Sequence, residues 1–203
     1  MDRMPSVRIP AVLAWALIAA VALLFAACAK MEPKFFNDVR LRAPVSVSPA
    51  RKDVRTALSI YVHNQVPDSP QVQRSDNLVV VNVADYRKSI YTALEAAFRQ
   101  NFPGVTQAAQ ENPVGYQLVV LQAQVLETNQ LQYHAALTFN GRDLVEVTGK
   151  TKGTTPAPPA RKGKWQDEVQ KMTVDAVEKS LAEMAEAIYQ QIFYNKEVSD
   201  QLI

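Results

Sequence analysis

The only cysteine of this chain stands at the end of an apolar run near its start. Arg3 and Arg8 precede that run (residues 11–27), which ends in Ala-Ala directly before Cys28. A basic start, a short apolar stretch and small residues at a cleavage point are typical of a secretory signal. Its removal leaves about 176 residues, from 28 to 203, with a single thiol. Because no disulfide can form within that chain, a hydrophobic core must stabilise the fold.

The residues around Cys28 resemble the bacterial lipobox, in which the cysteine is acylated and becomes the first mature residue. Ala26 and Ala27 match that motif, while Phe25 stands where Leu is usual. The resemblance implies a covalent diacylglycerol and an N-acyl chain on Cys28, with no other cofactor. Ala29 in the next position implies the outer rather than the inner membrane. A plain secretory signal and an uncleaved anchor stay open as alternatives, although a spanning helix needs about 20 apolar residues.

Composition indicates one ordinary globular domain. The mature length suits a single domain, and the formal net charge of +2 over the whole chain gives no reason to expect nucleic acid as a partner. With Cys28 acylated and only His63 and His134 as histidines, we expect no metal site. We therefore divide the chain into a lipoprotein signal peptide (1–27), a lipidated tether with a first edge segment (28–50), and one periplasmic domain (51–203).

The first half of the mature chain predicts short strands followed by a helix. Leu58, Ile60 and Val62 alternate with other residues, which predicts a strand. Asp85 is expected to cap the N-terminus of a helix whose apolar stripe includes Ile90, Leu94 and Phe98. In order, we expect a tether (29–38), a strand start (39–42), an edge segment (45–47), a strand (56–62), a loop (64–77), a strand (78–83) and a helix (86–100).

The second half predicts a β-hairpin. A strand over 116–126 is apolar on both faces in its first half, so it is expected to be central in its sheet. The alternating residues 131–140 lead into Asn140-Gly141, which is a strong hairpin signal. A two-residue loop would set Glu146 on the core face opposite Ala135. We prefer a three-residue loop, which pairs Ala135 with Val145, because a one-residue slip turns every apolar side chain to the wrong face.

A loop and a long helix complete the predicted fold. Residues 151–164 hold three prolines and two glycines, which indicates a flexible, extended, basic loop. Val177, Leu181, Met184 and Ile188 recur at helical spacing within a predicted helix over 167–195. Helices on one face of a sheet give an α+β fold. We expect a two-layer sandwich in which two helices pack on one face of a small, mainly antiparallel sheet.

From residue 85 to about 198 this layout resembles the YajG-type family of small envelope lipoproteins. The matching features are the lipobox cysteine, the helix at 86–100, the strand at 116–125, the hairpin at 133–141 and the stretch 174–184. A more distant likeness is to the lipopolysaccharide-assembly lipoprotein LptE. Both resemblances imply an outer-membrane-anchored periplasmic domain that helps or braces other envelope components. Neither supplies a catalytic motif.

Two sequence features are candidate contact surfaces. A basic group near an aromatic residue suits anionic lipid headgroups, lipopolysaccharide phosphates or peptidoglycan carboxylates; the alternative is a solvated loop. Aromatic residues widen the apolar band of the last helix, which indicates either core or a patch for a partner. The basic group comprises Lys150, Lys152, Arg161, Lys162 and Lys164 with Trp165, and the aromatic group comprises Tyr189, Phe193 and Tyr194.

Motifs for catalysis are missing from the sequence. The serines do not lie in a glycine-rich nucleophile elbow, and the pair Asp167-Glu168 suits the first turn of a helix. We therefore expect a non-catalytic lipoprotein at the periplasmic face of the outer membrane, acting as a binding or scaffold subunit of an envelope assembly. The alternative is an auxiliary subunit of lipid or lipopolysaccharide transport, which predicts an apolar groove between sheet and helices.

Overall fold

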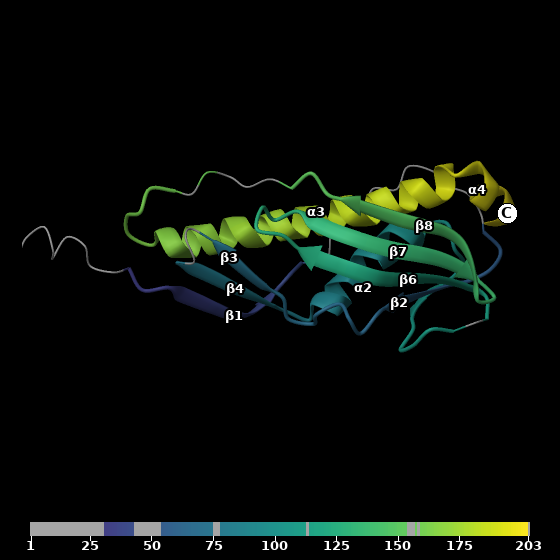
Figure 1. Ribbon diagram of the computed structural model, residues 1–203, viewed down its shortest axis with the longest axis horizontal. Helices are drawn as coiled ribbons and strands as arrows, with labels where there is room; N and C mark the ends of the chain where they lie inside the picture. Colours follow the sequence, from purple (N-terminus) through teal and green to yellow (C-terminus); the bar gives the residue numbers. More distant parts are fainter. Residues whose placement is uncertain are drawn as a thin grey trace, which may run out of the picture. The chain divides into compact units, whose positions relative to one another are not determined.

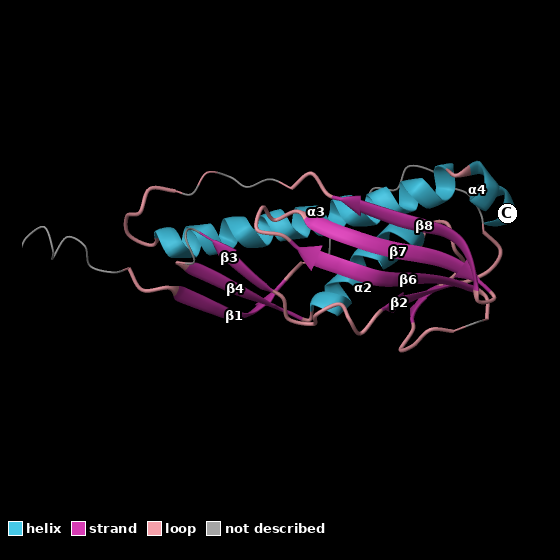
Figure 2. Cartoon of the chain, in the orientation of Figure 1, coloured by secondary structure: helices cyan, strands magenta, loops and turns pink. Residues whose placement is uncertain are grey.

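The computed structural model describes residues 31–42, 54–74, 78–112, 114–153, 157 and 159–202. From Pro33 onward the chain forms one compact unit, and its described residues build eight strands in two sheets and three helices (Figures 1 and 2). The α+β class is thereby confirmed. The signal peptide, Cys28 and the edge segment at 45–47 are predictions that lie outside the described residues.

Three strands form the smaller sheet. β4 (Val79–Ala84) lies between β1 (Lys34–Arg40) and β3 (Gln71–Arg74), parallel to β1 and antiparallel to β3. The prediction of a tether over 29–38 is therefore wrong from Lys34 onward, and the predicted loop at 64–77 contains a strand. β1 and β3 give only a weak strand signal in the sequence because few of their side chains are buried. In β3, Val72 is the one fully buried residue.

Five strands form the larger sheet, in the order β5-β2-β6-β7-β8. β2 runs parallel to both β5 and β6, whereas β6, β7 and β8 are mutually antiparallel neighbours. β6 is central, as predicted, but the single, mainly antiparallel sheet is replaced by two mixed sheets. The bounds are β2 (Leu58–Val62), β5 (Val105–Gln107), β6 (Tyr116–Val125), β7 (Leu131–Phe139) and β8 (Arg142–Lys150).

The β7-β8 hairpin corrects the predicted loop. Phe139 pairs with Arg142 across the two residues Asn140 and Gly141, whose φ angles of 50° and 76° suit a type I′ turn. An extra residue in β8, Leu144, then shifts the register. This bulge sets the valines of β8 opposite the core residues of β7, as Val145 opposite Leu137 and Val147 opposite Ala135. The face was predicted correctly, but a tight turn plus a bulge achieves it.

Three helices accompany the sheets: α2 (Tyr86–Phe98), α3 (Trp165–Tyr194) and α4 (Lys196–Leu202). α3 contacts β1 and β4 of the smaller sheet and β7 and β8 of the larger one, while α2 packs on α3, β2 and β5 (Figure 1). The layer between the larger sheet and the helices is filled by side chains with 0 % exposure. They include Leu118, Leu137, Leu181, Met184 and Ile188.

Asp85 precedes α2 but does not cap it. Its φ of 53° is left-handed, and its side chain makes no capping hydrogen bond. The carboxylate instead lies 3.5 Å from Nε of Arg40 at the end of β1. The predicted N-cap position is therefore confirmed, but the side-chain cap is not made, because the left-handed backbone differs from the extended conformation that lets a side chain reach the first free N–H groups.

Candidate functional site

The predicted lipidation site, Cys28, lies outside the described residues, but the start of the folded unit limits its reach. β1 begins at Lys34, six residues after Cys28. An extended chain spans at most about 3.3–3.6 Å per residue, so this connection reaches roughly 20 Å. A lipid on Cys28 would therefore hold the start of β1 close to a bilayer.

The start of β1 lies beside the start of α3 (Figure 1). Lys34 Nζ is 2.5 Å from Oδ1 of Asp167 in the first turn of α3, and it also lies 5.0 Å from the ring centroid of Phe36. Gln166 Nε2 donates a hydrogen bond of 3.0 Å to the carbonyl of Leu78, directly before β4. These contacts join β1, β4 and α3 at one end of the unit.

Three basic residues precede α3 at this end. Arg161, Lys162 and Lys164 are all exposed. We call the end of the unit that carries Lys34, Phe35, Arg161, Lys162 and Lys164 the basic end. Because side chains alternate along a strand, Phe35 lies on the face of the smaller sheet opposite to α3, while Lys34 reaches α3. Phe35, the second residue of β1, is 57 % exposed there. The sequence prediction missed Lys34 and Phe35 because it assigned them to a tether, although adjacent aromatic residues such as Phe35-Phe36 favour a strand.

Trp165 does not form part of this exposed surface. Its side chain is buried, with 6 % exposure, as the first residue of α3. The guanidinium carbon of Arg161 lies 5.7 Å from the Trp165 ring, within the range of a cation–π contact. Trp165 therefore positions Arg161 instead of meeting a partner, which corrects its predicted role.

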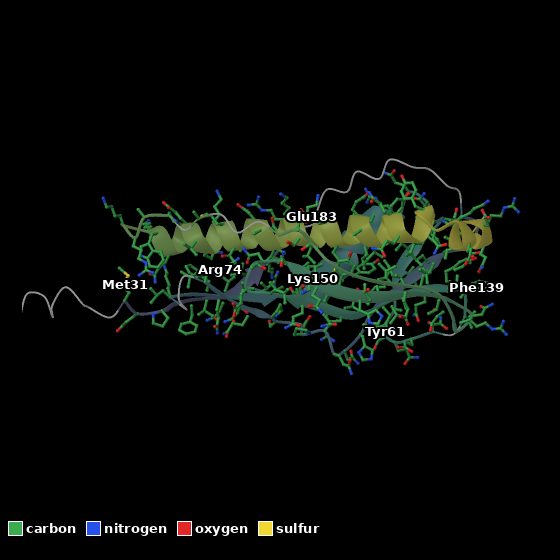
Figure 3. The ribbon with its side chains drawn as sticks, turned by 45° about the horizontal axis from the view of Figure 1, so that its top comes forward. Met31, Tyr61, Arg74, Phe139, Lys150 and Glu183 are labelled. Atoms are coloured by element: carbon green, nitrogen blue, oxygen red, sulfur yellow. The ribbon has the colours of Figure 1, made fainter. Side chains whose placement is uncertain are left out.

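The predicted basic group is divided between two places. Lys150 ends β8, and the Lys152 N–H donates a hydrogen bond of 3.1 Å to Oε2 of Glu183 in the middle of α3 (Figure 3). Glu183 is eighteen residues from Trp165, the first residue of α3, which is about 27 Å at 1.5 Å per residue. Lys150 and Lys152 therefore lie far from Arg161, Lys162 and Lys164, and the five residues do not form one patch.

The predicted aromatic surface is mostly core. Tyr189 and Phe193 are 1 % and 4 % exposed. Their ring centroids lie 4.6 Å apart with the rings tilted by 41°, and both rings contact Phe98 of α2. Burial raises the pKa of Tyr189. Tyr194 alone of the three is exposed, at 73 %. The core alternative thus holds for Tyr189 and Phe193, and only Tyr194 remains available to a partner.

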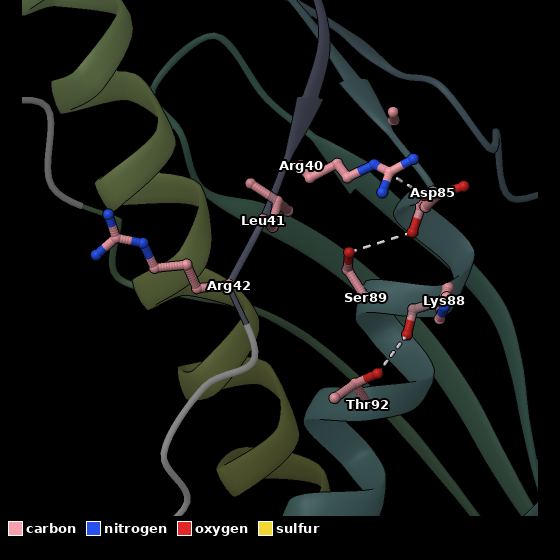
Figure 4. Close-up of a pocket in the computed structure, with 8 residues that line it drawn as sticks. Arg40, Leu41, Arg42, Asp85, Lys88, Ser89 and Thr92 are labelled. Atoms are coloured by element: carbon pink, nitrogen blue, oxygen red, sulfur yellow. Dashed lines mark hydrogen bonds and ion pairs between the residues drawn. The ribbon is translucent and has the colours of Figure 1, made fainter.

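A small cavity of about 180 Å³ lies between the end of β1 and the outer face of α2 (Figure 4). The two arginines that line it, Arg40 and Arg42, do not converge. Arg40 turns to Asp85, whereas the Arg42 side chain points towards α3 (Figure 4). The hydroxyls of Ser89 and Thr92 donate to backbone carbonyls one turn earlier in α2, at 3.1 and 2.9 Å. This cavity therefore offers no assembled anion site.

A larger cavity of about 590 Å³ lies where β6 extends beyond the end of β2. It is lined by uncharged amide side chains such as Gln122 and Gln124, by apolar residues and by His134. His134 Nε2 is 3.7 Å from Oε2 of Glu146 on β8. His63 is not among the lining residues, although its Nδ1 accepts a hydrogen bond of 3.1 Å from the N–H of Gln65, which is one of them. The lining shows no pair of groups arranged for proton transfer.

Two general findings apply to the described residues. Among them, no group of three or more His, Cys, Asp or Glu side chains is placed to hold a metal ion. No helix in the described ranges is both long enough and apolar enough to cross a membrane.

Comparison with known proteins gives the fold alone. No protein-family model and no curated protein sequence matches this chain. A solved structure similar to it is the crystal structure of protein XCC0632 from Xanthomonas campestris, described as family-model DUF330. The TM-score is 0.50 at 11 % sequence identity, and the match covers 78 % of this chain and 97 % of that chain. At this identity the likeness shows that the two chains share an architecture.

Proposed function

We propose that this chain is a non-catalytic lipoprotein, anchored through Cys28 at the periplasmic face of the outer membrane, and that it serves as a binding or scaffold subunit of an envelope assembly. The observation that carries the proposal is the place of its only cysteine. Cys28 follows a secretory signal pattern and stands six residues before the first strand of the folded unit.

Lipidation would give stable attachment. One acyl chain binds a bilayer only marginally, whereas two membrane signals suffice for stable anchoring. A diacylglycerol and an N-acyl chain on Cys28 would supply three chains. Tethering then raises the effective concentration of the domain for nearby partners without any new contact, which is how a scaffold subunit can act without chemistry.

The interior of the unit supports a scaffold over a carrier that holds lipid between sheet and helices. The transport alternative predicts an apolar groove in that layer. Leu118, Leu137 and Leu181 fill it with 0 % exposure. A rigid, filled core suits a protein that works through its outer surfaces, of which Tyr194 and the basic end are the exposed candidates.

The direct test replaces the lipidated residue in the full chain. Cys28→Ala is expected to move the protein from the membrane fraction to the soluble periplasmic fraction. The matched control is Phe25→Leu, which restores the usual lipobox residue and should leave the protein in the membrane fraction. Unchanged membrane association of Cys28→Ala would refute lipid anchoring at this position.

A second readout tests the scaffold role. Crosslinking on intact cells should join the wild-type protein to an envelope partner. If tethering supplies the effective concentration, the Cys28→Ala protein should yield several-fold less of the same crosslinked product. An equal yield from the released protein would contradict the tethering mechanism.

A further inference from the structure

We propose that the basic end faces the bilayer and binds anionic lipid headgroups through Arg161, Lys162 and Lys164, with Phe35 at headgroup level. This inference rests on the proposed anchor at Cys28 and extends it, because it states which end of the anchored domain faces the membrane. The start of β1 and the start of α3 form the membrane-facing end, and the end with α4 and the β7-β8 turn points away.

The length of the connection supports this polarity. The roughly 20 Å available between Cys28 and Lys34 is less than half the length of α3, whose 30 residues span about 45 Å. The far end of the unit includes α4 and the start of β6, since the Tyr116 hydroxyl donates to the carbonyl of Gln201 at 2.8 Å. A short tether therefore brings the basic end to the surface more readily than the far end.

Charge at the basic end matches an anionic surface. Three exposed cations occur within four residues, and basic residues beside an anionic leaflet each favour binding. Lys34 Nζ lies 2.5 Å from Oδ1 of Asp167, and the opposite charges of these two side chains offset each other. Glu168 is an exposed acid in the same first turn. Glu32, two residues before Lys34, is a further exposed acid, so the four cations of this end exceed its three acids by one charge.

Two aromatic residues complete the surface in different ways. Trp165, buried at the first position of α3, holds Arg161 beside its ring, which fixes one of the three cations relative to the fold. Phe35 is 57 % exposed at the same end of the unit, on the face of the smaller sheet opposite to α3, so it would reach the headgroups beside the cations and not among them. An exposed aromatic ring near lysines and arginines is typical of surfaces that enter the headgroup region.

The test measures the distance of each end from the bilayer with single fluorescent labels. If Cys28 is lipidated, its sulfur is blocked and any introduced cysteine is the only reactive thiol. The label is placed at Ala160→Cys, an exposed position that leaves all three cations in place, or at Asp143→Cys in the distant β7-β8 hairpin. The full lipidated protein is reconstituted in vesicles of phosphatidylcholine with phosphatidylglycerol that carry a headgroup quencher.

We expect strong quenching at position 160 and little at position 143. Replacing Arg161, Lys162 and Lys164 with Glu should shift the orientation equilibrium by about fivefold per charge removed, or at least 100-fold in total. Quenching at position 160 should then be largely lost. The matched control is the double variant Lys150→Glu with Lys152→Glu. It changes the charge at the end of β8, beside the middle of α3, and should leave the quenching unchanged. Phosphatidylcholine vesicles, or about 1 M salt, where the Debye length is about 3 Å, should also weaken it.

Several outcomes would overturn the inference. These are equal quenching at both positions, stronger quenching at position 143, or quenching at position 160 that ignores vesicle charge. Capture of soluble peptidoglycan fragments by the basic end, without quenching in anionic vesicles, would assign it to a different polyanion. Failure of the anchor is seen separately: the parent protein without an added cysteine would then take the label at Cys28.

Discussion

The two ends of α3 are built in different ways. Its second half lies in a closed core, where Leu181, Met184 and Ile188 have 0 % exposure and the rings of Tyr189 and Phe193 meet Phe98. Its first half also buries Trp165, Val169 and Val177 in the core, but it contains fewer large buried side chains and adds polar contacts to the segments around the smaller sheet. Lys34 pairs with Asp167, Gln166 donates to the Leu78 carbonyl, and the Arg42 N–H donates to Glu178 Oε1 at 2.6 Å.

This difference means that one end of α3 contributes more to the stability of the fold, while the other end is free to present exposed groups to a partner. Burial of apolar area supplies most of the free energy of folding, so the second half of α3 should dominate the stability of the unit. Exposed ion pairs contribute little, so the segment directly before α3 and the start of β1 can carry exposed cations and an aromatic ring. The proposed membrane contact thus lies where substitutions cost least stability.

Truncation in the aromatic core should give the largest effect. Phe98→Ala removes a fully buried ring that lies 5.5 to 6.1 Å from three others. We expect the free energy of unfolding to fall by about 3–5 kcal/mol, measured by denaturant unfolding. The control is Phe35→Ala at the basic end, with an expected change within about 0.5 kcal/mol. Similar losses from both variants would remove the contrast between the two ends.

A buried hydroxyl should give a smaller effect of opposite sign. Among the described residues the Tyr86 hydroxyl has no hydrogen-bond partner, although the side chain is 0 % exposed. An unsatisfied buried polar group destabilises the folded state, so Tyr86→Phe should raise the free energy of unfolding by about 1 kcal/mol. A clear decrease would show that the hydroxyl has a partner.

The same residue gives a pH dependence. Burial raises the pKa of Tyr86 in the folded state above its ordinary value of 10.0. Above that pH the unfolded chain loses the phenol proton while the folded chain keeps it, so the free energy of unfolding should fall by up to about 1.4 kcal/mol per pH unit. Below pH 10 the effect is absent. Tyr86→Phe should lose stability less steeply in alkaline titration, and parallel curves for both proteins would contradict the burial effect.

The ion pair at the basic end should give the smallest effect. The side chains of Lys34 and Asp167 are 46 % and 42 % exposed, and exposed pairs contribute between about 0 and 1 kcal/mol. Lys34→Ala should therefore lower the free energy of unfolding by at most about 1 kcal/mol, with a difference that shrinks at high salt. A loss as large as that of Phe98→Ala would mean that this exposed ion pair stabilises the fold as much as a buried aromatic ring does.

Elements with a clear period were predictable from the sequence. Leu58, Ile60 and Val62 alternate in β2, and Ile90, Leu94 and Phe98 form the buried stripe of α2. β3 and β5 were missed because strands of four and three residues bury too few side chains to show alternation. The strand predicted to start at residue 39 overlaps only the last two residues of β1, and the rest of β1 was missed because its burial pattern is largely exposed and its partner, β4, is distant in sequence.

The candidate surfaces were harder to predict because they depend on distances through space. Lys150 and Lys164 are close in sequence. In the fold, however, the chain just after Lys150 contacts the middle of α3, whereas Lys164 directly precedes the start of that helix (Figure 1). Whether Trp165 and Tyr189 are buried depends on which elements cover them. The Asn140-Gly141 turn was correctly located, but the bulge at Leu144 was not predicted. The bulge adjusts the pairing of all of β8 with β7, so no local sequence signal reveals it.

The most direct test of the account is the intact mass of the protein purified from the membrane fraction. We expect a chain that begins at Cys28 and carries the mass of a diacylglycerol and a further acyl chain. An exported chain whose first residue is unmodified would contradict the lipid anchor, and with it the proposed polarity of the domain.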